Sequence, residues 1–162
     1  MTKLEVPPPG KPASLDVPGL GRFVFDGGWR YSDGSSTCHY VFHIDTGGKE
    51  PALLLAYLKD DEVALSRSYA EHIRRTVEAV TPECRAFLHA ARQQLLDMMD
   101  RYEIDAPADY DVLVDELRIT HIKPYSDGSA ELIFDLCSWI QNFNINLRLD
   151  AQLQFEDIWF DG

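Results

Sequence analysis

The chain has 162 residues, of which 45% are apolar, and its 27 acidic and 15 basic side chains give a net charge of −12. This length is sufficient for one hydrophobic core. The acidic balance argues against a nucleic-acid partner and against an anionic membrane surface, since both are bound through Lys and Arg. No apolar run approaches the roughly 18–20 residues of a membrane span.

The amino-terminal segment and the cysteines indicate the compartment. The segment MTKLEVPPPGKPAS lacks the apolar core of a secretion signal. Three widely spaced cysteines, Cys38, Cys84 and Cys137, are an odd number that fits a reducing environment better than a disulfide framework. We therefore expect a cytoplasmic protein.

The first part of the chain predicts an irregular segment and then strands. Five of the nine prolines lie in residues 1–20, which predicts an irregular lead-in, followed by a single α+β domain over residues 21–162. Strand patterns occupy residues 22–44. Asp-Gly pairs at 26–27 and 33–34 indicate hairpin turns between GRFVF, WRYS and TCHYVFHID.

Helical signals predict about three helices, over residues 51–58, 61–79 and 82–102. Pro51 suits a first helical turn before ALLLAYL, and Asp60 or Asp61 suits the cap of the second helix. Thr81-Pro82 predicts a new start for the third, which places Cys84 in its first turn, where the helix dipole lowers a thiol pKa. A short helical turn is predicted over residues 109–114.

Residues 116–160 predict a β-meander. Phe143, Ile145, Leu147 and Leu149 alternate with polar residues, which predicts a strand with one buried face. Short turns imply antiparallel neighbours. The fold class predicted is α+β, with an antiparallel sheet built from residues 22–44 and 116–160, because strands and helices are segregated along the chain.

Catalytic signatures are absent from the sequence, which contains no phosphate-binding loop, GxGxxG, HExxH, paired CxxC or GxSxG. On one strand, His39 and His43 would lie roughly 13 Å apart, too far to share a zinc ion. The alternating pattern of its strand predicts a core position for His121. We therefore predict no catalytic residue, no cofactor and no metal site.

The negative charge is concentrated in the last part of the chain. Residues 97–162 carry 15 acidic and 4 basic side chains, which leaves −11 of the −12 in this segment. Such a surface is either a solvated face or a docking face for a basic partner. The candidate contact residues are Asp109, Asp111, Asp115, Glu116, Asp127, Glu131, Trp139, Glu156 and Asp157.

Three segments carry a resemblance to a known family. They are DELRITHIK (115–123), SDGSAELIFDLCSW (126–139) and NINLRLD (144–150). They resemble an uncharacterised family of bacterial domains, in which helices precede a β-meander whose second strand ends in Cys-x-Trp. The chain departs from this pattern at residues 140–143, where the family has an acidic turn containing His-Gly. Similar small acidic domains occur among immunity proteins of bacterial toxin systems, so the resemblance implies a protein partner such as a basic toxin.

Three hypotheses follow. The first is a non-enzymatic protein-interaction domain that binds a basic partner through its acidic C-terminal surface. The second is a small metal-dependent or hydrolytic enzyme that uses His39, His43 or His121 with nearby acids. The third is a homodimer assembled through an exposed sheet edge.

Overall fold

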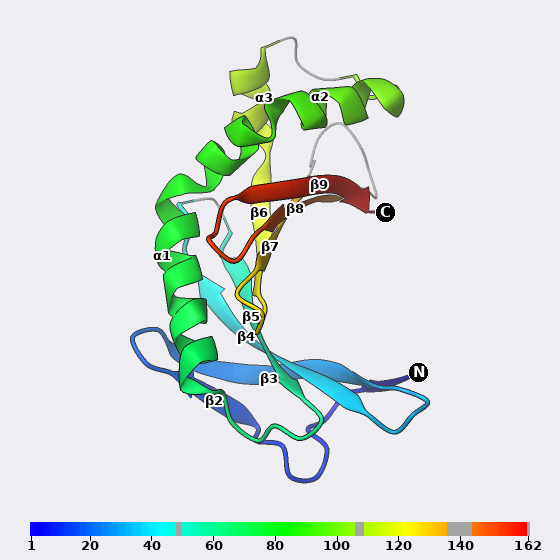
Figure 1. Ribbon diagram of the computed structural model, residues 1–162, viewed down its shortest axis with the longest axis vertical. Coiled ribbons are helices and arrows are strands. Elements are labelled where there is room, and N and C mark those ends of the chain that lie inside the picture. Colours follow the sequence, from blue (N-terminus) through cyan, green and yellow to red (C-terminus); the bar gives the residue numbers. More distant parts are fainter. Residues whose placement is uncertain (48–49, 106–108, 136–143, 162) are drawn as a thin grey trace.

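The computed structural model describes residues 1–47, 50–105, 109–135 and 144–161, and within them the fold is α+β. One large, twisted sheet runs in the order β1-β3-β4-β5-β6-β7-β8-β9, and β2 also pairs with β3 (Figure 1). The strands are β1 Thr2–Leu4, β2 Ser14–Val17, β3 Gly21–Arg30, β4 Ser36–Ile44, β5 Ala52–Lys59, β6 Arg118–Pro124, β7 Ala130–Asp135, β8 Asn144–Leu149 and β9 Phe155–Asp161. The helices are α1 Arg67–Ala90, α2 Arg92–Arg101 and α3 Tyr110–Glu116. None of these helices is long and apolar enough to cross a membrane.

The C-terminal meander is confirmed. Strands β6, β7, β8 and β9 pair consecutively and antiparallel. The sheet is nevertheless mixed, because β5 and β6 are parallel, with Leu53 opposite His121 and Leu54 opposite Ile122. All three helices lie in the connection between these two strands, and parallel neighbours require such a long crossover.

The predicted helix over residues 51–58 is wrong, since this segment forms strand β5 in the middle of the sheet. Leu54 and Leu58 are fully buried on one face, and Leu55 on the opposite face is only 7% exposed. A central strand with buried side chains on both faces has an almost continuous apolar run, and periodicity cannot distinguish such a run from a buried helix.

The predicted turn at residues 26–28 is also wrong, because β3 continues through it. A bulge at Asp26 shifts the β3–β4 register between Phe25 and Gly27. A Cβ atom on Gly28 would lie 2.4 Å from the carbonyl oxygen of Thr37, so glycine here permits close strand approach. The hairpin turn lies at the second Asp-Gly pair, where the Tyr31 N–H donates to the Ser35 carbonyl.

The predicted boundaries of the second and third helices are wrong as well. Helix α1 begins after Ser66, whose side chain accepts a hydrogen bond from the Tyr69 N–H, so neither Asp60 nor Asp61 is the cap. It continues through Pro82 to Ala90, and it bends along its length (Figure 1). An interior proline is an established cause of a helix bend. The helical turn predicted at residues 109–114 is confirmed as α3.

The amino-terminal segment predicted to be irregular contributes two short strands. β1 and β2 both pair with the outer edge of β3, β1 near its end and β2 near its start. Leu15 and Val17 of β2 are buried in the core, which explains why this proline-rich segment stays on the sheet.

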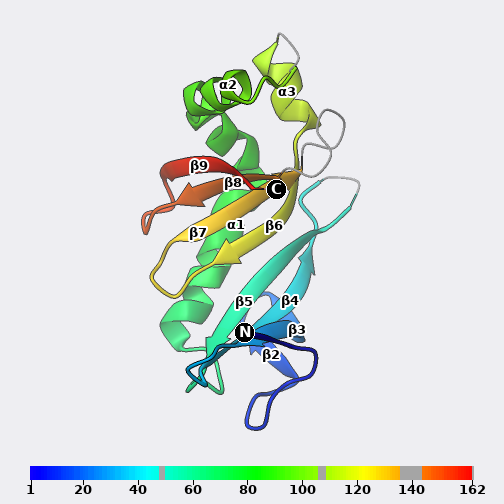
Figure 2. The same cartoon turned by 90° about the vertical axis from the view of Figure 1, so that its right-hand side faces the viewer.

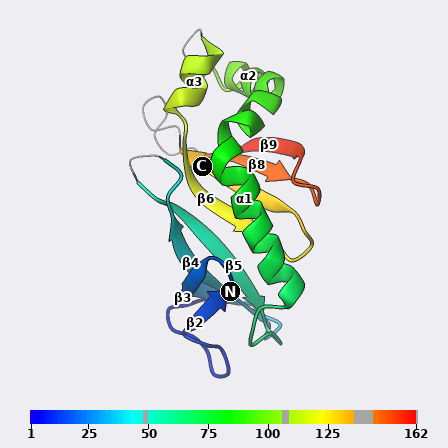
Figure 3. The same cartoon turned by 90° about the vertical axis from the view of Figure 1, so that its left-hand side faces the viewer.

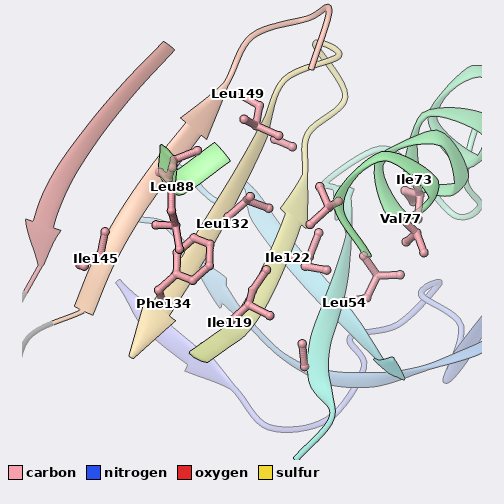
Figure 4. Close-up of a cluster of buried hydrophobic side chains, with 14 of the residues drawn as sticks. Leu54, Ile73, Val77, Leu88, Ile119, Ile122, Leu132, Phe134, Ile145 and Leu149 are labelled. Atoms are coloured by element: carbon pink, nitrogen blue, oxygen red, sulfur yellow. The ribbon is translucent and has the colours of Figure 1, made fainter. Parts of the chain in front are cut away.

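Helix α1 lies against one face of the sheet (Figure 3), whereas no described helix covers the opposite face (Figure 2). The core lies between α1 and the sheet and contains alternate residues of the strands (Figure 4). These include Leu54, Ile73, Val77, Leu88, Ile119, Ile122, Leu132, Phe134, Ile145 and Leu149.

One side chain of α1, Tyr69, bridges the parallel joint of the sheet, and a second, His72, bonds the turn between β6 and β7. The β5–β6 pairing covers only two residue pairs, and its continuation would place Tyr57 opposite Tyr125. The Tyr69 hydroxyl lies at this point, where it donates to the Pro124 carbonyl at 2.6 Å and accepts from the Tyr57 N–H at 3.3 Å. His72 Nε2 lies 2.9 Å from the Ser129 carbonyl oxygen. The helix therefore supplies hydrogen bonds where the two strands part.

Candidate functional site

The acidic residues predicted to contact a partner fall into two groups. One comprises Asp109, Asp111, Asp115 and Glu116 on and beside α3, and the other comprises Asp127, Glu131, Glu156 and Asp157 near the turns of the meander. Strand β6, which runs from α3 toward these turns, has seven residues and is therefore about 20 Å long. The two groups do not form one continuous surface.

The α3 group is largely used to hold α3 against α1. The Asp109 side chain caps α3 by accepting a hydrogen bond from the Asp111 N–H at 2.9 Å. The Asp111 carboxylate lies 3.7 Å from His89 Nε2, and the Asp115 carboxylate lies 2.5 Å from Arg85 Nη2. These acids are exposed, but partners within the chain reduce the charge that they offer to another protein.

The meander group surrounds Arg148. Its guanidinium lies 3.1 Å from the Glu156 carboxylate and 3.7 Å from that of Asp127, and Glu131 is its cross-strand neighbour. The hydroxyl and N–H of Ser129 both donate to Asp127, and these hydrogen bonds lower the pKa of that carboxyl. Arg148 therefore offsets part of the charge at this corner.

Aromatic and acidic side chains meet at the outer edge of β9. We define the β9 edge surface as Asp97, Met98, Tyr102, Asp157, Trp159, Phe160 and Asp161. Helix α2 lies beside β9 (Figure 1), and the two elements enclose a hollow of about 290 Å³. Tyr102 is 56% exposed, and its ring centroid lies 5.4 Å from that of Phe160. Since β9 pairs only with β8, its other edge is open in the described residues.

The acids of this surface lie in different surroundings: Asp157, which also belongs to the meander group, is the cross-strand neighbour of Arg148, whereas Asp97 lines the hollow together with Arg101. No basic side chain in the described residues forms an ion pair with Asp97, Asp157 or Asp161. The Asp97 carboxylate accepts a hydrogen bond from the Gln93 side chain, and the Asp157 carboxylate accepts one from the Ile158 N–H. Among the described residues, Asp97 and Arg101 are the charged residues that line the hollow. The surface combines exposed aromatic area with acids that form no ion pair among the described residues.

Sequence reasoning recovered only part of this surface. It selected Asp157 but not Met98 or Tyr102, which lie in the helix predicted over residues 82–102. Half-exposed aromatics cannot be separated from core aromatics by spacing alone, because both follow the helical period. Trp139, the one aromatic among the candidate contacts, lies outside the described residues.

The histidines proposed for an enzyme do not converge. His39 and His43 lie four residues apart on the same face of β4, and His43 and His121 are separated by Leu53 of the intervening strand. In the described residues, no group of three or more His, Cys, Asp or Glu side chains is arranged to hold a metal ion. His43 and His121 share a shallow hollow of about 360 Å³ near the Arg118–Glu50 ion pair.

His39 and His121 lie on the sheet face away from α1. His39 Nε2 is 3.5 Å from the Asp26 carboxylate, and burial lowers the pKa of His39, although Asp26 opposes this. The expectation that His121 is a core residue is wrong, because a bulge between Ile119 and His121 turns the side chain to the other face. Burial and the nearby Lys123 charge lower the pKa of His121.

Cys84 is not at a helix start, because α1 is continuous from Arg67 to Ala90. The thiol is half-buried, and burial raises its pKa. A raised pKa reduces the thiolate fraction, so the structure does not support a reactive role for Cys84.

Comparison of the chain with protein-family models, curated proteins and solved structures found no match.

Proposed function

We propose that this protein is a non-enzymatic protein-interaction domain, of the immunity type that its sequence resembles, and that its β9 edge surface binds a basic partner. The observation that carries this proposal is the aromatic hollow between α2 and β9, which Asp97 lines, together with Asp157 and Asp161 on β9. None of these three acids forms an ion pair in the described residues. Interfaces place aromatic anchors at their centre and charged groups at their rim.

The charges on β9 favour a different protein over a second copy of this chain as the partner. Three acids, Glu156, Asp157 and Asp161, lie on the strand, which has no Lys or Arg. Antiparallel pairing of two β9 strands would bring these acids close to one another, and like charges on neighbouring strands are destabilising. A basic segment would instead complement them.

The proposed mechanism is steering followed by occlusion. The acids of the β9 edge surface attract a basic surface over distances up to the Debye length, about 8–10 Å at physiological salt. An apolar or aromatic side chain of the partner then enters the hollow between α2 and β9, beside Tyr102 and Phe160. If the partner is a toxin, binding blocks its active surface without any chemical step in this protein.

Charge reversal on β9 tests the proposal. The partner is captured from the source organism with the tagged wild-type chain and purified, and its association rate is measured by surface plasmon resonance. The double variant Asp157→Lys/Asp161→Lys should associate at least tenfold more slowly at 50 mM salt, with little difference at 500 mM. The matched control is Asp33→Lys/Asp45→Lys, which reverses two exposed acids beside β4 and should change the rate less than twofold.

Two outcomes would contradict the proposal. One is an association rate of the wild-type chain with its partner that stays constant between 50 and 500 mM salt. The other is an equal effect of the β9 variant and its control, because the location of the charge would then be irrelevant.

A further inference from the structure

A second, larger groove lies at the other end of the sheet, between β2 and the first turns of α1. It encloses about 670 Å³, within the roughly 300–1,000 Å³ typical of ligand sites. Ser14 and Asp16 of β2 form one wall, and Arg67 and Ala70 of α1 form the opposite wall. Figure 1 shows β2 beneath the N-terminal turns of α1. We call this hollow the β2–α1 groove.

The outer edge of β2 presents backbone groups to this groove. The Phe25 N–H donates to the Ala13 carbonyl, so these two residues form a hydrogen-bonded pair of the antiparallel ladder. Such pairs alternate with non-bonded pairs. Ser14 and Asp16, opposite Val24 and Arg22, are therefore non-bonded positions whose N–H and C=O groups point away from β3. No hydrogen bond from another described segment occupies them.

The walls supply apolar contacts beside these polar groups. Val63, which is 64% exposed, lines the groove together with Ala64, Leu65 and Ala70. Apolar walls next to an open strand edge are what an extended peptide requires, because its backbone pairs with the edge and alternate side chains enter pockets.

One positive charge in the groove remains uncompensated. Arg74 pairs with Glu71 and Glu78, and Asp16 pairs with Arg22. Arg67 is exposed and has no ion-pair partner in the part of the chain that the structure describes. A ligand with a carboxylate would complement this guanidinium.

We propose that the β2–α1 groove binds an extended segment of a partner protein, which adds to the edge of β2 as a further strand and places an acidic side chain against Arg67. The four residues of β2 match about 13 Å of extended peptide. This site is independent of the β9 edge surface, since it lies on the opposite edge of the sheet and selects the opposite ligand charge. Either site can fail its test without affecting the other.

The probe is a phage-displayed library of random dodecapeptides, selected on the full chain and followed by synthesis of the enriched peptides. We expect enriched sequences with alternating apolar residues and one Asp or Glu. Fluorescence polarisation gives their dissociation constants, and amide hydrogen exchange should show at least tenfold slower exchange of the Asp16 N–H in the complex.

Two variants test the geometry. Asp16→Pro removes the outward N–H but no ladder hydrogen bond, and proline is tolerated at such edge positions. This variant should weaken peptide binding at least tenfold. Arg67→Glu should weaken binding of acidic peptides at least fivefold. Its matched control, Arg75→Glu, reverses an exposed charge on α1 outside the groove and should change binding less than twofold.

Failure to enrich any peptide would overturn the proposal, as would equal effects of Arg67→Glu and Arg75→Glu. Protection of the Asp16 N–H in the free protein that increases with protein concentration would also overturn it, because a second copy would then occupy the edge. If Asp16→Pro does not fold, the exchange measurement and the arginine pair still decide the question.

Discussion

Replacing Tyr69 with phenylalanine tests whether α1 holds the two halves of the sheet together. The Tyr69 side chain is 6% exposed, and its hydroxyl bonds the Pro124 carbonyl of β6 at 2.6 Å and the Tyr57 N–H of β5 at 3.3 Å. Tyr69→Phe keeps the ring and removes only the hydroxyl. The expected result is loss of stability without loss of the fold.

The magnitude follows from the two groups left without a partner. An unsatisfied buried donor or acceptor costs about 1–3 kcal/mol. The carbonyl bond is short and buried, whereas the N–H bond is long and part-buried, so the second contribution belongs at the lower end. We expect the free energy of unfolding to fall by about 2–4 kcal/mol, out of the roughly 5–15 kcal/mol typical of a folded protein.

Urea unfolding followed by circular dichroism measures this change, and the Tyr57 amide should exchange faster in the variant. The matched control is Tyr31→Phe, since Tyr31 is 41% exposed and its hydroxyl has no partner among the described residues. The control should change stability by less than about 0.5 kcal/mol. A Tyr69→Phe protein as stable as the control would refute the bridging role of this hydroxyl.

Three further predictions concern the sheet and its charges. Gly28→Ala should cost about 2–4 kcal/mol in urea unfolding, because the added Cβ meets a backbone carbonyl, whereas Gly34→Ala, at a positive φ of 89° but with open space, should cost about 1 kcal/mol. Arg148→Gln should destabilise the protein by about 0.5–1 kcal/mol at 50 mM salt and less at 500 mM, since two partly exposed ion pairs are lost. Burial raises the pKa of Tyr40 and of Tyr110 to about 12. Unfolded tyrosines ionise near pH 10, so the contribution of these two side chains to stability should be constant below pH 10. Between pH 10 and 12 it should fall by up to about 1.4 kcal/mol per pH unit for each tyrosine, measured by unfolding in urea at each pH; no fall in this range would contradict the prediction.

The parts of the fold that sequence reasoning predicted correctly are those with a local signal, although the predicted wet face of β8 is not exposed throughout, since Asn146 is only 2% exposed. The alternation of residues 144–149 specified strand β8, and residues 116–160 formed the expected meander. Asp109 was recognisable as the start of a helical turn because capping is a local interaction. In each case the information lies within a few neighbouring residues.

The errors share a different cause. The apolar run of β5 carries no period, so only its neighbours β4 and β6 show that it is a strand. Gly28 resembles a turn residue, but the carbonyl of Thr37 explains why it is glycine. Pro82 resembles a helix start, yet α1 continues through it because packing against the sheet holds both halves of the helix.

By itself, the sequence determined the class of the fold, the strands of the meander and the sign and location of the net charge, because composition and local periodicity need no partner. Only the tertiary structure decided which acids are neutralised by bases within the chain and which remain available at β9. It also decided that β2 presents an open edge to α1. Both depend on contacts between segments far apart in the sequence, where neither spacing nor composition carries information.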